Sequence, residues 1–256
     1  MKSKLVLLLI CVCCILTSCN KADNEDEVHR LFFAWTEGYL ASPVEQENVF
    51  ALTFYCKKNA SPFHLSEIVD IKFKNVLEQA ISLQYTVEPL NIEEEDGYLA
   101  YAVYFTYTPR QVGVFEADSI MFTLNNGDQL YYPFGHIAFD IDETDSEIIN
   151  TWESVAASSN SAIFPYSYSF NKKNAKLTKM QIGMDEIIFD VEGLEQSGRI
   201  HLEDSYSAPL VIIRAKLFID YNAETLISYG KGCYCGAGNA SESILNLSLE
   251  HWLSFD

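Results

Sequence analysis

The chain has 256 residues, of which 13% are aromatic, and its 36 acidic side chains outnumber 17 Lys and Arg to give a formal net charge of −19. This composition excludes a chain that is disordered throughout, and the length suffices for one large or two ordinary domains. The excess negative charge argues against nucleic acid and anionic lipid headgroups as partners, because both would be repelled.

The chain begins with a three-part segment that is typical of export signals. Lys2 and Lys4 give it a basic start, residues 5–16 are almost wholly apolar, and small residues then lead to Cys19. The apolar run is shorter than the roughly 20 residues that a membrane-spanning helix needs. We therefore expect a leader that directs export and is removed.

The end of this leader, Leu-Thr-Ser-Cys over residues 16–19, resembles the lipobox of bacterial lipoproteins. The resemblance implies that residues 1–18 are a signal peptide and that Cys19 becomes the first residue of the mature protein, with a diacylglyceryl group on its sulfur and an acyl chain such as palmitate on its nitrogen. An ordinary cleaved signal peptide and an uncleaved anchor remain the alternatives. Two or more acyl chains would hold the protein stably at the cell membrane or outer membrane, facing away from the cytoplasm.

The next two segments are a polar stretch and an apolar one. Residues 19–27 are rich in Asp, Glu and Asn, which is typical of a flexible, acidic tether. Residues 28–40 fit either a helical stripe or a strand. We favour a strand, because the pattern that follows belongs to β-structure.

Apolar and polar residues alternate through most of the segment from residue 49 to residue 141. Phe50, Leu52, Phe54 and Cys56 share one face, for example, and the turn-forming sequence Asn-Asn-Gly-Asp at 125–128 predicts a hairpin. Further alternating runs cover residues 69–74, 81–88, 99–107, 120–124 and 131–141. A period of two residues predicts antiparallel sheets with one buried face, and we assign a first β-sandwich to residues 28–145.

The alternation stops between residues 146 and 162. Ile148, Ile149, Trp152 and Val155 have the spacing of a short amphipathic helix, and a serine-rich stretch at 158–161 is typical of a connection. We therefore expect residues 146–162 to form a linker with a short helix, and we place the domain boundary there.

Alternation returns in the second half of the chain. It covers residues 164–170, 187–192, 211–221 and 245–255, and in the third of these runs Arg214, Lys216 and Asp220 lie opposite the apolar face. We assign a second sandwich to residues 163–256, with its last strand at the end of the chain. The predicted fold class is all-β, with two antiparallel, immunoglobulin-like β-sandwich domains after the signal peptide and tether.

The mature chain would keep three thiols besides Cys19. This odd number excludes a disulfide framework. Cys56 lies on an apolar face, so we expect it to be buried and inert. Cys233 and Cys235 lie among glycines, where they could bind a soft metal or cycle between redox states, yet the nearest histidine is His251 and no Cys-x-x-Cys is present. We favour a glycine-rich loop with two idle thiols and no structural disulfide.

The acidic run at 140–145 begins like a calcium-binding loop. It has Asp145 at the sixth position, where the loop needs Gly, and Thr151 at the twelfth, where it needs Glu. We interpret it as a solvated linker, and we expect no metal and no cofactor. The sequence contains no zinc-protease, hydrolase, P-loop or dinucleotide motif, which makes an enzyme less favoured without excluding residues that converge only in the fold.

The sequence therefore predicts a membrane-anchored binding or interaction module of the cell envelope, with sandwich loops as the contact site for a protein or small-molecule ligand. The alternatives are an envelope enzyme or redox protein that uses Cys233 and Cys235, and a structural subunit of an envelope assembly. A pocket with convergent polar groups is typical of ligand sites and enzymes. A long unpaired edge strand or a large apolar patch is typical of an assembly subunit.

Overall fold

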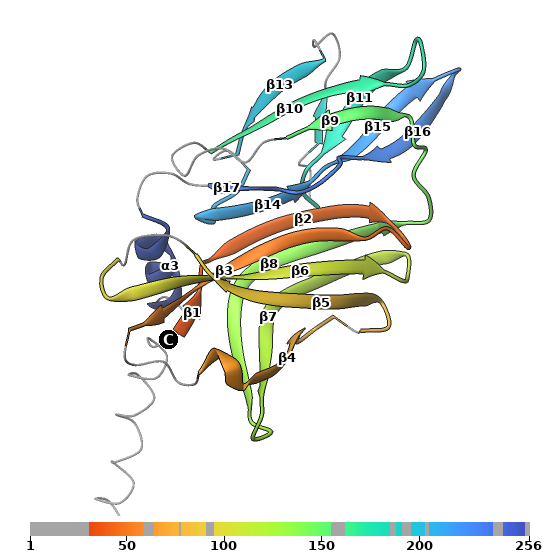
Figure 1. Ribbon diagram of the computed structural model, residues 1–256. Coiled ribbons are helices and arrows are strands. Elements are labelled where there is room, and N and C mark those ends of the chain that lie inside the picture. The colour runs from red at the N-terminus through yellow and green to blue at the C-terminus, as the bar shows by residue number, and fades with distance from the viewer. Residues whose placement is uncertain are drawn as a thin grey trace, which may run out of the picture.

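The computed structural model describes residues 31–58, 64–76, 78–90, 95–154, 162–184, 188–190, 196–202, 205–237 and 243–253. Strands dominate these residues, which confirms the predicted all-β class. Figure 1 shows two β-sandwiches stacked against each other, with β14 and β17 between them. The predicted signal peptide, the lipidation site Cys19 and the tether over 19–27 lie outside the described residues. In the part of the chain that the structure describes, no helix has the length and apolar character to cross a membrane.

The first sandwich consists of a four-stranded sheet that faces a six-stranded sheet. The four-stranded sheet has the order β1 (Leu31–Phe33), β3 (Asn48–Lys57), β6 (Tyr98–Pro109) and β5 (Ile81–Pro89). The six-stranded sheet has the order β17 (Tyr234–Ala237), β14 (Leu210–Arg214), β2 (Thr36–Pro43), β8 (Gln129–Asp142), β7 (Gly113–Leu124) and β4 (Ile68–Phe73). A short 3-10 turn, η1 (Leu65–Glu67), precedes β4.

The core of this sandwich is built from the apolar faces that the alternation predicts. Phe50 stacks on Phe105 of its own sheet with ring centroids 5.2 Å apart, and it contacts Phe73 and Phe139 of the facing sheet at 6.2 and 6.1 Å. Burying one such ring contributes roughly 1.5–3 kcal/mol to the free energy of unfolding. Cys56 belongs to the same core and is 7% exposed, as expected.

Strand β2 departs from the antiparallel pattern. It pairs in parallel with both β8 and β14, whereas every other pair of described strands is antiparallel. Seven of its eight residues are buried, because β2 lies inside the sheet with the first core on one face and the second sandwich on the other. Parallel strands are usually covered on both faces in this way, so the expectation of antiparallel pairing throughout is wrong for β2.

The second sandwich is formed by the other two sheets. Their orders are β13 (Ser197–His201), β10 (Ile163–Phe170) and β9 (Ile149–Glu153) for one, and β12 (Ile188–Asp190), β11 (Lys176–Gln181), β15 (Lys216–Tyr221) and β16 (Glu224–Tyr229) for the other. Phe164, Leu177 and Leu217 are almost fully buried between them.

The helix predicted within residues 146–162 is a strand where the structure describes it, since residues 149–153 form β9. Ile149 and Trp152 are three residues apart, as on a helix face, yet both are buried in the second core. A β-bulge is the reason. The register with β10 shifts between Ser169 and Phe170, and the extra residue Asn150 turns both apolar side chains to the same side.

The two halves of the chain share a sheet. β14 and β17 come from the predicted second domain, yet they complete the six-stranded sheet of the first sandwich. β14 and β15 are separated by Ala215 alone, so the chain passes directly from one sandwich to the other. Val211 and Ile213 belong to the second core and Ile212 to the first. The division into domains over 28–145 and 163–256 stays a prediction, but the two sandwiches are joined by strand pairing.

The last described element is a helix, α3 (Ile244–Leu253), where the sequence predicted a strand. Leu245, Leu249 and Trp252 recur at the spacing of a helix face and pack beside Phe32 and Tyr55 at one end of the first sandwich. Leucines at every second position fit the repeat of a strand as well as that of a helix, and the contacts with the sandwich favour the helix.

Candidate functional site

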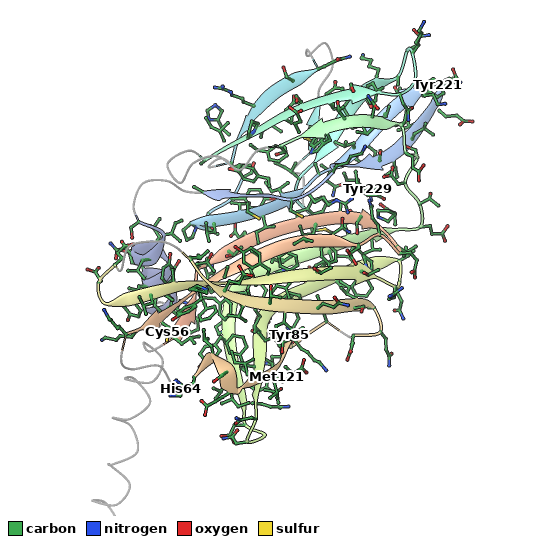
Figure 2. All side chains as sticks on the ribbon, viewed as in Figure 1. Cys56, His64, Tyr85, Met121, Tyr221 and Tyr229 are labelled. Carbon is green, nitrogen blue, oxygen red and sulfur yellow. The ribbon has the colours of Figure 1, made fainter. Side chains whose placement is uncertain are left out.

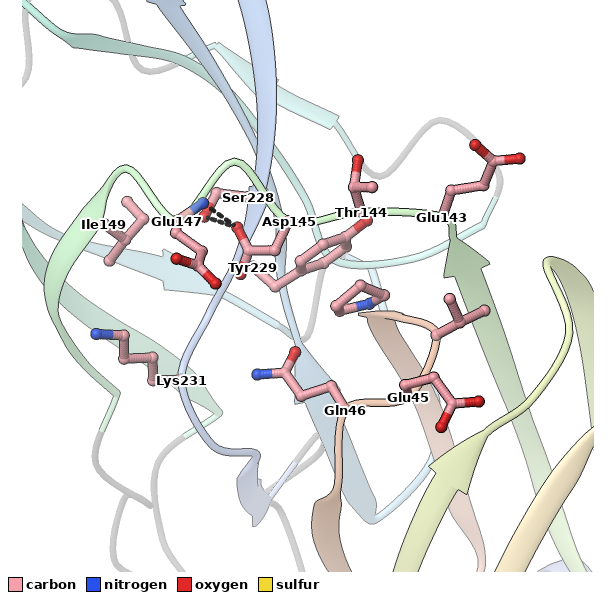
Figure 3. Close-up of a pocket in the computed structure, with 12 residues that line it drawn as sticks. Glu45, Gln46, Glu143, Thr144, Asp145, Glu147, Ile149, Ser228, Tyr229 and Lys231 are labelled. Atoms are coloured by element: carbon pink, nitrogen blue, oxygen red, sulfur yellow. Dashed lines mark hydrogen bonds between the residues drawn. The ribbon is translucent and has the colours of Figure 1, made fainter.

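A cleft of about 690 Å³ lies where the two sandwiches meet (Figure 3). It is lined by residues of three segments, namely 43–46 at the end of β2, 143–149 between β8 and β9, and 228–231 at the end of β16. Figure 2 places Tyr229 at this boundary. The cleft is thus formed at the ends of strands, and the hydrophobic cores of the two sandwiches fix the positions of these strands.

Acidic side chains dominate the cleft. Glu45, Glu143, Asp145 and Glu147 line it, and Lys231 is the one basic residue among its lining residues. Glu45 forms an ion pair at 2.6 Å with Arg110, which is exposed and does not line the cleft. The cleft therefore carries an excess of negative charge, which attracts cations.

Hydrogen bonds hold the acidic segment in place. The Asp145 carboxylate accepts hydrogen bonds from the Ser228 hydroxyl at 2.7 Å and from the backbone N–H of Glu147 at 2.9 Å. The backbone N–H of Ser146 donates to the Ile227 carbonyl at 3.0 Å. Glu147 has a φ of +52°, which non-glycine residues seldom adopt and which often marks functional segments.

Beneath the cleft, a buried cation binds two aspartates. The Lys216 ammonium lies 2.7 Å from the Asp142 carboxylate and 3.2 Å from that of Asp140. Tyr229 donates a hydrogen bond to Asp142 and Tyr39 donates one to Asp140, both at 2.6 Å. Burial raises the pKa of both tyrosines, and the hydrogen-bonded carboxylates raise it further, so both hydroxyls stay protonated.

Arg214 connects this junction with the core of the first sandwich. It is 2% exposed, its Nε donates to the Gly230 carbonyl at 2.8 Å, and its Nη2 donates to the Gln46 side-chain oxygen at 3.0 Å. The guanidinium also lies 5.7 Å from the ring centre of Tyr229. Because Gln46 and Tyr229 line the cleft, Arg214 supports two of its residues from below.

The structure changes the interpretation of several charged residues. The sequence placed Asp140 and Asp142 in a solvated linker, but both belong to β8 and bind Lys216. It also placed Arg214 and Lys216 on the face opposite the apolar one, where solvent was expected, yet they are 2% and 8% exposed. A lysine and an arginine inside an apolar run were the available signal, because such residues are seldom buried without partners.

Cys233 and Cys235 are free thiols that do not line the cleft. Both pack against the first core. Burial of its thiol raises the pKa of Cys233 to about 12, and burial raises that of Cys235 too, although the Ala51 backbone N–H opposes the shift. A protonated thiol is a weak nucleophile and metal ligand, so the environment does not favour redox chemistry.

The side chain of His251 lies outside the described residues, and among those described no group of His, Cys, Asp and Glu is arranged to hold a metal.

No family model matches the chain, and no curated protein does. Solved structures that are similar to it include the cadherin-like domains of zebrafish RET, at 7% identity and a TM-score of 0.28, with 81% of this chain and 50% of that chain covered. Another is the sialic acid binding region of a Streptococcus sanguinis adhesin, at 10% identity and a TM-score of 0.24, with 79% and 47% covered. A Porphyromonas gingivalis protein of unknown function has 10% identity and a TM-score of 0.25, with 81% and 99% covered.

The chain spans about half the length of the first two of these structures. At such TM-scores the similarity carries no argument about function. The fold class rests on the strands and sheets of the chain itself.

Proposed function

We propose that this protein is a lipid-anchored binding protein of the cell envelope and that the acidic cleft between its sandwiches binds a cationic ligand, such as an amine or a lysine-rich peptide segment. The observation that carries the proposal is the convergence of four carboxylates from two segments on one cleft that has a single lysine. The cleft volume lies in the range of about 300–1,000 Å³ that is typical of ligand sites.

Most of the excess charge comes from the rim of the cleft. Below it, Lys216 pairs with both Asp140 and Asp142 and offsets one of their two negative charges, and the tyrosine hydroxyls beside them are neutral. Glu143 and Glu147 form no ion pair with another described residue. A cation that enters the cleft therefore meets two carboxylates, those of Glu143 and Glu147, that no cationic side chain of the described residues occupies.

The lipid anchor would place the cleft outside the cytoplasm. Supporting this part of the proposal are the basic start, the apolar run and the Leu-Thr-Ser-Cys sequence that ends at Cys19. Because the net charge repels anionic headgroups, the acyl chains and not the protein surface would hold the molecule at the membrane.

Binding is a better account of the cleft than catalysis. Its lining residues include neither histidine nor cysteine, so the Ser–His and Cys–His pairs that activate many nucleophiles are missing from it. The two cysteines of the redox alternative lie elsewhere and stay protonated.

Calorimetric titration with trilysine tests the proposal, with trialanine as the neutral probe. We expect wild-type protein to bind trilysine and the double variant Glu143→Gln, Glu147→Gln to bind it about 3- to 10-fold more weakly, given the energies of exposed ion pairs. The matched control is Glu88→Gln, Glu224→Gln, which removes the same charge from exposed positions on β5 and β16. Equal losses in both double variants would show that only net charge matters and would contradict a cleft site.

A further inference from the structure

The core of the first sandwich contains three buried polar atoms that no described protein group satisfies. They are the Ser42 hydroxyl, the Tyr107 hydroxyl and Nη1 of Arg214. Ser42 and Tyr107 are fully buried, and Arg214 is 2% exposed. Buried polar atoms are nearly always hydrogen-bonded, so each such atom requires an explanation.

Strand register brings the three groups together. Leu40 of β2 is paired with Arg214 of β14, and both Leu40 and Ile212 face the first core. Ser42 and Arg214 each lie two residues from one of these apolar residues, so they face the same core. Tyr107 enters that core from the facing sheet. Burial raises the pKa of Tyr107, and the Arg214 guanidinium and the Ser42 hydroxyl, which lie close enough to act as hydrogen-bond neighbours of its hydroxyl, lower it. Neither contact has the geometry of a formed hydrogen bond.

The charge of Arg214 also lacks a direct counterion. Its Nε and Nη2 donate to two neutral oxygens, those of Gly230 and Gln46, and its face lies over Tyr229. No carboxylate in the described part of the chain pairs with it. The buried aspartates of the junction bind Lys216 instead. A buried cation without a bound anion is costly, because burial removes the hydration of its charge.

We propose that Ser42, Tyr107 and Arg214 bind one small inorganic anion, such as chloride, inside the first sandwich. Each group can donate a hydrogen bond, and Tyr107 is protonated at neutral pH, so a monovalent anion can accept all three bonds and neutralise the guanidinium. A single water accepts two hydrogen bonds at most and leaves the charge without a counterion. The site lies beneath the cleft, because Arg214 also binds Gln46 of its lining.

Thermal unfolding at constant ionic strength tests the site, with sodium chloride exchanged for sodium gluconate, whose anion is too large for a packed core. A ligand that binds only the native state raises the midpoint of unfolding as its concentration rises. We expect such a rise in wild-type protein. Tyr107→Phe and Ser42→Ala each remove one donor and should at least halve the chloride-dependent rise.

The matched control is Tyr206→Phe, which removes a buried hydroxyl that donates to the Ile182 carbonyl in the second sandwich. It should lower stability without changing the response to chloride. Arg214→Met should abolish the response to chloride. If that variant does not fold, Tyr107→Phe and Ser42→Ala still test whether the site exists. A response that is the same in all variants would show a general salt effect and overturn the proposal.

Crystals soaked in sodium bromide give a direct readout. Anomalous scattering should show a bromide within hydrogen-bonding distance of Arg214 Nη1, Tyr107 Oη and Ser42 Oγ in wild-type crystals, and no peak there in Tyr107→Phe crystals. Density for a water with no anomalous signal at saturating bromide would overturn the anion site and show that water satisfies these groups.

Discussion

At the residue scale, the junction depends on a few buried polar side chains whose ionisation is set by their surroundings. Tyr39 and Tyr229 share the two aspartates of β8 with Lys216. Each tyrosine donates a hydrogen bond to a carboxylate, so ionisation of either hydroxyl would break that bond and place two negative charges side by side.

This arrangement predicts a loss of stability at alkaline pH. The pKa of Tyr39 and of Tyr229 is raised in the folded protein, whereas unfolded tyrosine ionises near pH 10. The folded state therefore binds more protons above that pH, and each tyrosine removes roughly 1.4 kcal/mol from the free energy of unfolding per pH unit. Urea denaturation across this range measures the slope.

Tyr39→Phe separates this effect from general alkaline unfolding. The variant should lose about 2 kcal/mol at neutral pH, the typical contribution of a hydrogen bond to a charged group, and it should show a shallower slope above pH 10. Tyr131→Phe, at an exposed position, is the matched control. A slope in Tyr39→Phe that equals that of the wild type would contradict the assignment of this tyrosine as a buried donor.

At the element scale, the faces of the long strands could be predicted from sequence, and the pairing partners could not. Phe50, Leu52 and Phe54 are buried as the alternation predicts. The pattern within a strand reports which side is buried, but carries no information on which strand lies beside it. The parallel pairing of β2 with β14 depends on residues far apart in the chain, and no local signal marks it.

The sequence pattern predicted the wrong secondary structure for two elements, and each error has a physical reason. The bulge in β9 and β10 gives a strand the apolar spacing of a helix, and the leucines of α3 have a spacing that fits a strand as well.

The candidate cleft could not be predicted from the sequence either. Glu45, Asp145 and Lys231 come from three separate segments, and only the junction of the sandwiches brings them together.

Helix α3 is expected to stabilise the end of the first sandwich through its tryptophan. The Trp252 indole N–H donates to the Phe33 carbonyl at 3.1 Å, and its ring lies 6.4 Å from that of Phe32. Trp252→Ala should lower the free energy of unfolding by about 2–4 kcal/mol, toward the lower end of tryptophan deletions, because the side chain is only half-buried. Urea denaturation measures the loss.

Glu250→Ala is the matched control, since it is an exposed position of the same helix and alanine keeps the helix propensity high. Its effect should stay within about 0.5 kcal/mol. If both variants lost the same stability, the helix and not its contact with β1 would be responsible.

At the scale of the whole molecule, the shared sheet makes the two sandwiches depend on each other. A protease site inserted among residues 155–160, outside the described residues, should permit cleavage into two fragments. We expect the fragments to stay associated, because β14 and β17 of the second fragment pair with β2 of the first. Size-exclusion chromatography under native conditions, followed by a denaturing gel, measures this. Elution as separate fragments would support independent domains.

The proposed membrane anchor also belongs to the scale of the whole molecule. Cys19→Ser should leave an unlipidated precursor in the producing cell, because the serine hydroxyl does not replace the thiol that lipobox-containing proteins modify. Wild-type protein should enter the detergent phase in a phase separation, and the variant should not. Mass spectrometry that found a mature N-terminus other than Cys19, or no acyl mass on it, would exclude the anchor.

The position of β2 also determines the order in which the chain can fold. Thr36–Pro43 pairs with β8 on one side, whereas its other neighbour, Leu210–Arg214, lies about two-thirds of a chain length later. A polypeptide that emerges from its N-terminus must therefore keep one edge of β2 unpaired until the last quarter of the sequence arrives. Contacts between such distant residues slow folding, and an unpaired edge invites association with other chains. During synthesis, we therefore expect the unfinished chain to be more prone to aggregation than the complete one.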